Sequence, residues 1–97
     1  MPPQPQNKCG HVGLASELRV AADLLLKGYQ VYSAFRVGNI FDLVISKDSH
    51  IFLKVEVKTA NRFKSSPIMW VKNPDILALV NYEGKIVYIK KPGIESF

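Results

Sequence analysis

Two segments rich in β-branched and aromatic residues flank a loop of hairpin length, and this pattern constrains the fold more than any other feature of the chain. Residues 40–45 (IFDLVI) and 51–58 (IFLKVEVK) have the composition of β-strands, and residues 47–50 (KDSH) join them. If the hairpin is centred near Ser49, Asp42 lies opposite Glu56, because the two are equally distant from that centre. Side chains alternate along a strand, so Glu56 and Lys58 share a face. The sequence therefore predicts two carboxylates and one amine on a single patch of sheet.

The two facing carboxylates repel each other unless a cation lies between them. At about 5 Å and an effective dielectric constant near ~20, Coulomb's law gives about 3 kcal/mol against the pair. Lys58 offsets part of this repulsion, and a divalent cation offsets far more, since Mg²⁺ is commonly held by one or two carboxylates with waters and substrate phosphate. Such an ion polarises a phosphoryl oxygen, and a nearby lysine stabilises the charge of the transition state. The patch is therefore a candidate site for phosphodiester hydrolysis. The alternative is a salt-bridge cluster on a solvated sheet face, which contributes little to stability.

Length, charge and cysteine content describe an ordinary small domain with a basic surface. The 97 residues predict a mobile, proline-rich tail over residues 1–10 and a single domain over residues 11–97. The net charge of +5 favours polyanionic partners, nucleic acid foremost. No apolar run is long enough to span a bilayer, no signal-peptide pattern is present, and Cys9 is the only cysteine. We therefore expect an intracellular, cytoplasmic protein that binds no membrane.

The order of the expected elements is typical of an α+β fold. A helix over residues 11–27 should end with Gly28 at its C′ position, with an apolar stripe of Leu14, Leu18, Ala21 and Leu25. Residues 29–35 predict a first strand, and residues 75–82 and 85–90 predict a second hairpin around Glu83 and Gly84. The sum is a sheet of about five strands, the first three forming a meander, with the helix packed on one face.

Glu17 is the charged residue of this helix that lies nearest to the expected stripe. At 100° per residue it sits about 60° from the stripe's centre, whereas Arg19, Asp23 and Lys27 point away. A carboxylate at the edge of a buried face is costly unless it is paired or bound to a metal. The alternative is an acid favoured by the positive end of the helix dipole.

These residues resemble the signature of the PD-(D/E)xK nucleases. The resemblance rests on residues 41–45 (FDLVI), residues 56–59 (EVKT) and an upstream Gly-x-x-x-Glu segment from Gly13 to Glu17. It implies a restriction-endonuclease-like core with a mixed sheet, and a DNA endonuclease dependent on Mg²⁺, for which Mn²⁺ would substitute. It further implies that Asp42 and Glu56 bind the metal, Lys58 is the catalytic amine and Glu17 is an auxiliary acid. The chain is most similar to small Holliday-junction resolvases and intron-encoded homing endonucleases of this fold, although Phe41 replaces the proline of the motif.

Further basic and polar residues near the expected site are candidates for DNA contacts. They are Arg36, Asn39, Lys54, Arg62 and Lys64. The alternative for each is an exposed, solvated loop or strand position. One domain with one site cuts one strand, so paired cleavage predicts a homodimer or higher oligomer, with the interface sought at residues 68–71 and in the last hairpin.

A second literal match to the motif, Asp75 with Glu83 and Lys85, is rejected. Gly84 places Glu83 and Lys85 around a turn, so they would not share a strand face. The strongest rival to a nuclease is a noncatalytic DNA-binding or assembly module that keeps the fold. Three DNA targets fit the sequence equally: a branched junction, a specific duplex site and damaged duplex.

Overall fold

The computed structural model describes residues 5–33, 43–60, 67–95 and 97 of the chain. It has one long helix, five strands and one short 3₁₀ helix in these parts. In chain order they are α1 (Pro5–Leu26), β1 (Gln30–Tyr32), β2 (Leu43–Ser46), β3 (Phe52–Thr59), η1 (Pro67–Trp70), β4 (Ile76–Val80) and β5 (Ile86–Lys90). None of the described helices is long and apolar enough to cross a membrane.

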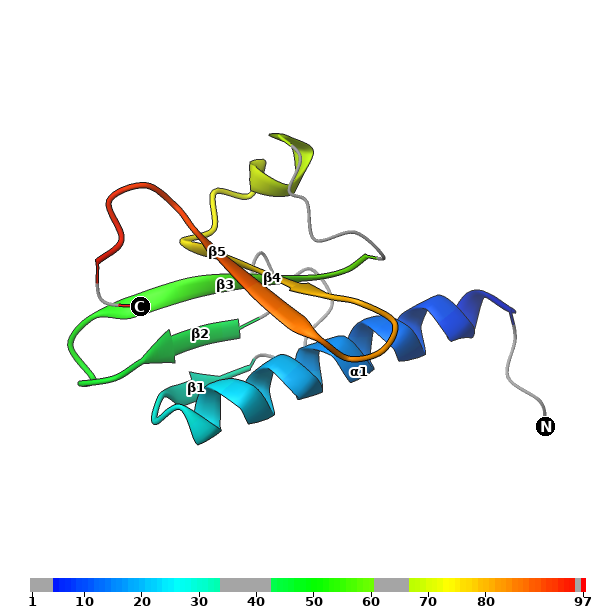
Figure 1. Ribbon diagram of the computed structural model, residues 1–97, viewed down its shortest axis with the longest axis horizontal. Coiled ribbons are helices and arrows are strands. Elements are labelled where there is room, and N and C mark those ends of the chain that lie inside the picture. Colours follow the sequence, from blue (N-terminus) through cyan, green and yellow to red (C-terminus); the bar gives the residue numbers. More distant parts are fainter. Residues whose placement is uncertain (1–4, 34–42, 61–66, 96) are drawn as a thin grey trace.

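The five strands form one mixed sheet in the order β1-β2-β3-β4-β5. The first three strands are an antiparallel meander, β3 and β4 are parallel, and β4 and β5 form the second antiparallel hairpin. Parallel neighbours cannot be joined by a tight turn, so the chain between β3 and β4 must cross over the sheet. α1 runs along one side of the sheet and η1 lies on the other (Figure 1). The predicted α+β class, five-stranded sheet and packed helix are confirmed.

The two ends of α1 follow from a proline and a glycine. Gly28 has φ +94° and its N–H donates to the Leu25 carbonyl, while the Tyr29 N–H donates to the Leu24 carbonyl. This pair of bonds is a Schellman motif, so the prediction that Gly28 ends the helix at C′ is confirmed. The described part of the helix starts at Pro5, six residues before the predicted start near His11, and the mobile tail over residues 1–10 stays a prediction. Pro5 is tolerated because the first turn of a helix makes no use of its missing N–H.

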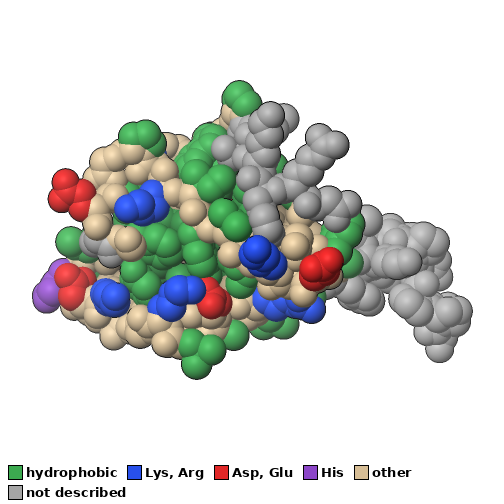
Figure 2. Space-filling model, in the orientation of Figure 1, with side chains coloured by type: hydrophobic (Ala, Val, Ile, Leu, Met, Phe, Trp, Pro, Cys, Tyr) green, Lys and Arg blue, Asp and Glu red, His purple; other side chains and the backbone are tan. Residues whose placement is uncertain are grey.

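α1 packs on the sheet through a different stripe from the one predicted. Ser16, Val20 and Leu24 are buried, whereas Leu18 and Leu25 are more than half exposed. Apolar residues lie on both sides of this helix, so periodicity alone did not determine which side faces the sheet. Figure 2 shows apolar side chains, in green, along the lower rim of the molecule, where α1 runs in Figure 1.

Two charged residues of α1 also differ from the prediction that they point away from the sheet. The Asp23 carboxylate accepts a hydrogen bond from Tyr88 on β5. Arg19 lies over the turn between β4 and β5, because a Cβ added at Gly84 would come 1.7 Å from a guanidinium nitrogen of Arg19. Both contacts follow from the rotated stripe, which turns the Asp23 side of the helix towards β5.

The main core lies between α1 and one face of the sheet. Its buried members are Val20, Leu24, Tyr29, Leu43, Ile45, Leu53, Val55, Val57, Ile76, Ala78 and Val80. The other face is also covered in part, because Leu77 and Leu79 are fully buried although they belong to the opposite set of β4 positions. The described part of the crossover between β3 and β4, residues 67–75, lies on this side of the sheet (Figure 1). The candidate carboxylate Glu56 therefore does not lie on an open, solvated sheet.

Candidate active site

The hairpin between β2 and β3 has the register that the sequence predicts. The described pairs, from Ser46 with Phe52 to Leu43 with Val55, are symmetric about position 49. The loop is held by Asp48, whose carboxylate accepts the N–H groups of His50 at 2.9 Å and Ile51 at 3.0 Å. These bonds, that from Ile51 above all, lower the pKa of Asp48. The predicted pairing of Asp42 with Glu56 is the next step of this register, but Asp42 lies outside the described residues.

Glu56 is almost fully buried and carries an oxygen that lacks a partner. Only 2% of the residue is exposed, and its carboxylate sits on the sheet face away from α1. Oε1 lies 3.3 Å from Lys58 Nζ and 3.6 Å from Lys72 Nζ. Oε2 is buried and has no hydrogen-bond partner among the described residues. A buried carboxylate oxygen without a donor is costly, which makes this atom a candidate cation ligand.

The prediction that Glu56 and Lys58 share one face of β3 is confirmed by their ion pair. Lys58 stands opposite Leu79, and Glu56 stands opposite Leu77, so both side chains rise beside fully buried leucines. The Lys58 side chain is 42% exposed, so its ammonium group lies between the buried Glu56 carboxylate and solvent. The arrangement thus joins a buried acid to an accessible amine.

The described residues supply only part of the ligand set that a divalent cation such as Mg²⁺ needs. Carboxylate oxygens are the ligands that Mg²⁺ prefers, and Glu56 Oε2 meets this requirement. Across residues 5–33, 43–60, 67–95 and 97, no three His, Cys, Asp or Glu side chains gather closely enough to hold a metal ion. The second predicted ligand, Asp42, is outside these ranges, so the test concerns Glu56 alone.

Glu17 lies on the helix that covers the other face of the sheet from Glu56. Its neighbour Ser16 is buried, and the Ser16 hydroxyl lies 2.6 Å from the Thr59 hydroxyl at the end of β3. Thr59 follows Lys58 directly, so this bond brings the backbone of Glu17 close to the end of the strand that carries Lys58. The two hydroxyls also line a hollow of about 250 Å³ between α1 and the ends of β3 and β4. The role of Glu17 as an auxiliary acid stays a prediction.

The structure describes one of the five predicted DNA-binding residues. Lys54 is described: it is partly exposed and lies on the same face of β3 as Glu56. The remaining four, Arg36, Asn39, Arg62 and Lys64, lie outside the described residues. The expectation of a homodimer through residues 68–71 or the last hairpin also stays a prediction.

Lys72 is a residue of the site that sequence reasoning missed. It follows Glu56 by sixteen positions and belongs to the irregular crossover, so neither strand alternation nor helical spacing relates it to the site. The sequence signal next to it is the turn-forming pair Asn73 and Pro74. This pair marks the end of the crossover, directly after Lys72 and shortly before β4.

The second literal motif match has structural roles. The Asp75 carboxylate accepts the Lys54 N–H at 2.8 Å and so holds the crossover to β3. Glu83 is exposed in the turn between β4 and β5, where the Asn81 side chain accepts the N–H groups of Glu83 and Lys85. Asp75 and Glu83 thus sit in two different turns, which supports the rejection of this match.

Comparison with known proteins supports the fold. No family model matches the chain. No curated protein matches it either. Among solved structures, the chain is similar to a bacterial homing endonuclease, I-Ssp6803I, with a TM-score of 0.63 and 18% sequence identity over 80% of this chain. The match spans 66% of the length of that protein. The chain therefore has a homing-endonuclease-like fold, and this likeness shows the fold alone.

Proposed function

We propose that the chain is a metal-dependent DNA endonuclease of the PD-(D/E)xK type. The observation that carries the proposal is Glu56, a buried carboxylate with one oxygen near two lysines and the other without a hydrogen-bond partner in the part of the chain that the structure describes. A fold kept only for stability gains little from such a group, because an apolar side chain of similar size would fill the same space without the desolvation cost. The fold shared with a homing endonuclease is consistent with this proposal.

Asp42 and Glu56 would hold the cation, Mg²⁺ or Mn²⁺. The symmetric register of β2 and β3 supports this pairing, because its continuation by one residue leads to positions 42 and 56. When bound, the cation polarises a phosphoryl oxygen and lowers the pKa of a bound water. Lys58 would orient that water or stabilise the charge that develops on the phosphate, since its ammonium group is accessible and already lies 3.3 Å from Glu56. Glu17 would act as an auxiliary acid from α1.

The substrate would bind over the sheet face that carries Lys54 and Lys58. The net charge of +5 favours a polyanion, and phosphate contacts by Arg36, Asn39, Lys54, Arg62 and Lys64 would fix the DNA beside the site. Cleavage of both strands of a duplex, or of a branched junction, would require at least a homodimer.

A cleavage panel tests the proposal. Purified protein is incubated with supercoiled plasmid, linear duplex and four-way junctions in Mg²⁺, in Mn²⁺ and in EDTA. We expect nicking that requires the metal, and loss of nicking by Glu56→Gln or Lys58→Ala with DNA binding largely retained. The matched controls Glu83→Gln and Lys85→Ala, from the exposed turn, should cut like the wild type.

The alternative is the noncatalytic DNA-binding or assembly module. It makes the opposite prediction: DNA binding without metal-dependent nicking of any of these substrates. That result would overturn the nuclease proposal while leaving the fold intact.

A further inference from the structure

Lys72 reaches the candidate site from a different part of the chain than the other charged groups. Its Nζ lies 3.6 Å from Glu56 Oε1, the same oxygen that Lys58 contacts. Lys58 belongs to β3, whereas Lys72 belongs to the crossover that follows η1. The two ammonium groups therefore approach one carboxylate oxygen from the strand and from the segment above it.

The backbone that follows Lys72 is fixed to the sheet by several hydrogen bonds. Asn73 adopts φ +55° and its N–H donates to the Trp70 carbonyl at 2.9 Å, while its side chain accepts the Lys91 ammonium at 2.6 Å. Asp75 donates its N–H to the Lys54 carbonyl and accepts the Lys54 N–H. These contacts hold the end of the crossover to β3 and β5. Lys72 is thus placed over Glu56 by the fold itself.

Among the described residues of this site, two lysines approach one carboxylate. One carboxylate carries one negative charge, whereas Lys58 and Lys72 together carry two positive charges. Nearly half of the Lys72 side chain is exposed, so its ammonium group is partly hydrated as well as being near Glu56. An exposed ammonium group at an accessible surface attracts phosphate groups. The exposed part of the Lys72 side chain can therefore meet a phosphate group from solvent while it stays near Glu56.

We infer that Lys72 is a DNA-contacting residue of this site, which binds a backbone phosphate next to the one that is cleaved. The inference rests on the proposed function and extends it to the crossover segment. The crossover then has two tasks, because it shields Glu56 from water and supplies a cation for the substrate. Since Lys72 shares Glu56 with any bound metal ion, its charge also opposes that ion.

Two measurements that do not depend on cleavage test the inference. The first is the salt dependence of duplex DNA binding in EDTA for wild type, Lys72→Ala, Lys72→Arg and the control Lys90→Ala, whose exposed lysine lies on β5. Loss of one phosphate contact reduces the slope of log K against log [salt] by about 0.9. We expect this reduction for Lys72→Ala and not for Lys72→Arg or Lys90→Ala. An unchanged slope for Lys72→Ala, or an equal loss in Lys90→Ala, overturns the inference.

The second measurement is calorimetric titration with Mn²⁺ alone. Removal of a neighbouring positive charge should strengthen Mn²⁺ binding by Lys72→Ala about threefold to tenfold, since exposed charge pairs interact only weakly. Weaker Mn²⁺ binding would mean that Lys72 serves to hold Glu56 in place, and would overturn the inference.

The results separate this inference from the nuclease proposal. A reduced slope together with absent nicking keeps the role of Lys72 in DNA binding and rejects the nuclease. Normal metal-dependent nicking by the wild type, together with an unchanged slope for Lys72→Ala, keeps the nuclease proposal and rejects the role of Lys72 in DNA binding. A wild-type protein that binds no DNA rejects both.

Discussion

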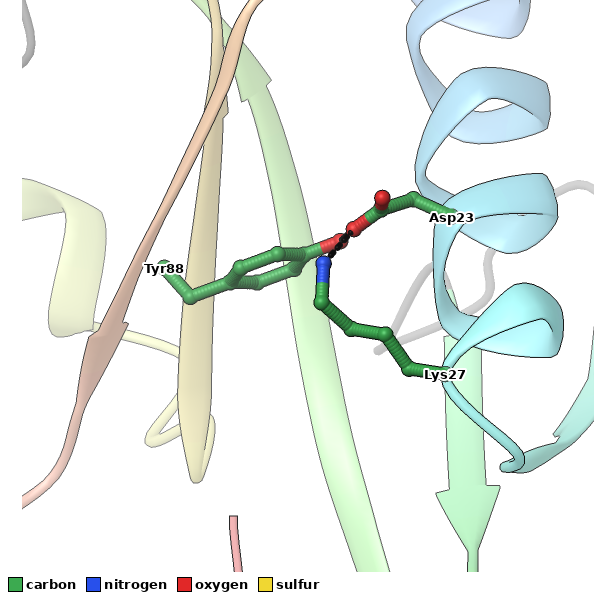
Figure 3. Close-up of polar contacts among 3 residues, drawn as sticks. All are labelled: Asp23, Lys27 and Tyr88. Atoms are coloured by element: carbon green, nitrogen blue, oxygen red, sulfur yellow. Dashed lines mark hydrogen bonds and ion pairs between the residues drawn. The ribbon is translucent and has the colours of Figure 1, made fainter.

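The Tyr88 hydroxyl on β5 donates a 2.5 Å hydrogen bond to the Asp23 carboxylate on α1 (Figure 3). The same carboxylate oxygen accepts a bond from Lys27, one helical turn further on. The bond from Lys27, followed by that from Tyr88, lowers the pKa of Asp23. Burial, followed by the contact with Asp23, raises the pKa of Tyr88. This cluster ties the C-terminal half of α1 to the edge strand of the sheet.

The first prediction concerns this link. Tyr88→Phe should lower the free energy of unfolding at pH 7 by about 1 kcal/mol, the usual net value of one hydrogen bond. A carboxyl with a lowered pKa stabilises the fold above its ordinary value, 3.8 for Asp23, and that stability is lost as the pH falls through the folded-state pKa. The difference between wild type and variant should therefore shrink below about pH 4 in urea titrations. A difference that stays constant down to pH 2 would contradict the assigned role of Asp23.

At alkaline pH, stability changes with pH in the opposite direction. A tyrosine with a raised pKa stabilises the fold fully below its ordinary value of 10.0 and less as the pH rises above it. Wild-type stability should fall above about pH 10 more steeply than that of Tyr88→Phe.

The second prediction compares two adjacent leucines of α1. Leu24 is fully buried against the sheet, whereas Leu25 is 57% exposed. Leu24→Ala should cost about 2–5 kcal/mol in thermal or urea unfolding, the usual range for a buried leucine. Leu25→Ala should change the free energy of unfolding by less than about 0.5 kcal/mol, as surface substitutions do. Equal losses would mean that Leu25 is covered in solution, for instance by a second copy of the chain.

The sequence predicted the sheet better than the orientation of the helix. Strand alternation and loop length are local properties, and they were sufficient to place Glu56 beside Lys58 and to centre the first hairpin at Ser49. The prediction of which side of α1 faces the sheet was wrong, because Leu14, Leu18 and Leu25 recur along the helix as regularly as Ser16, Val20 and Leu24. The choice between the two stripes depends on the sheet, which local periodicity does not contain.

The burial of Glu56 could not be predicted for a related reason. The sequence after β3 is mostly polar, and it has no hydrophobic periodicity that would place its described part, residues 67–75, on the second side of the sheet. Lys72 was missed with it, since its contact with Glu56 depends on the path of that segment. The burial of Glu56 and its contact with Lys72 thus depend on the long-range packing of a loop, which the spacing of the motif does not describe.

The third prediction tests how α1 is attached to the end of β3. The Ser16 and Thr59 hydroxyls lie 2.6 Å apart, and Ser16 is 4% exposed. In a double-mutant cycle with Ser16→Ala and Thr59→Val, we expect a coupling energy of about 0.5–1.5 kcal/mol in urea unfolding. Additive effects would show that the two hydroxyls do not interact in solution.

The fourth prediction separates the stability of the fold from the activity of the site. Glu56 is buried beside Leu77 and Leu79, and its Oε2 has no hydrogen-bond partner among the residues that the structure describes. The carboxylate therefore costs desolvation energy that its two half-exposed lysines only partly offset. In the absence of divalent ions, the free energy of unfolding of Glu56→Leu should therefore lie within about 1 kcal/mol of the wild-type value or above it.

The same variant should lose the response to metal. On the proposed function, Mn²⁺ binding to the native state should raise the Tm of the wild type with concentration, whereas Glu56→Leu should show no rise and no nicking. Lys85→Ala, which changes an exposed charge elsewhere, should respond like the wild type. If Glu56→Leu were several kcal/mol less stable, Glu56 would be a structural ion-pair residue, and the case for a cation at Oε2 would fail.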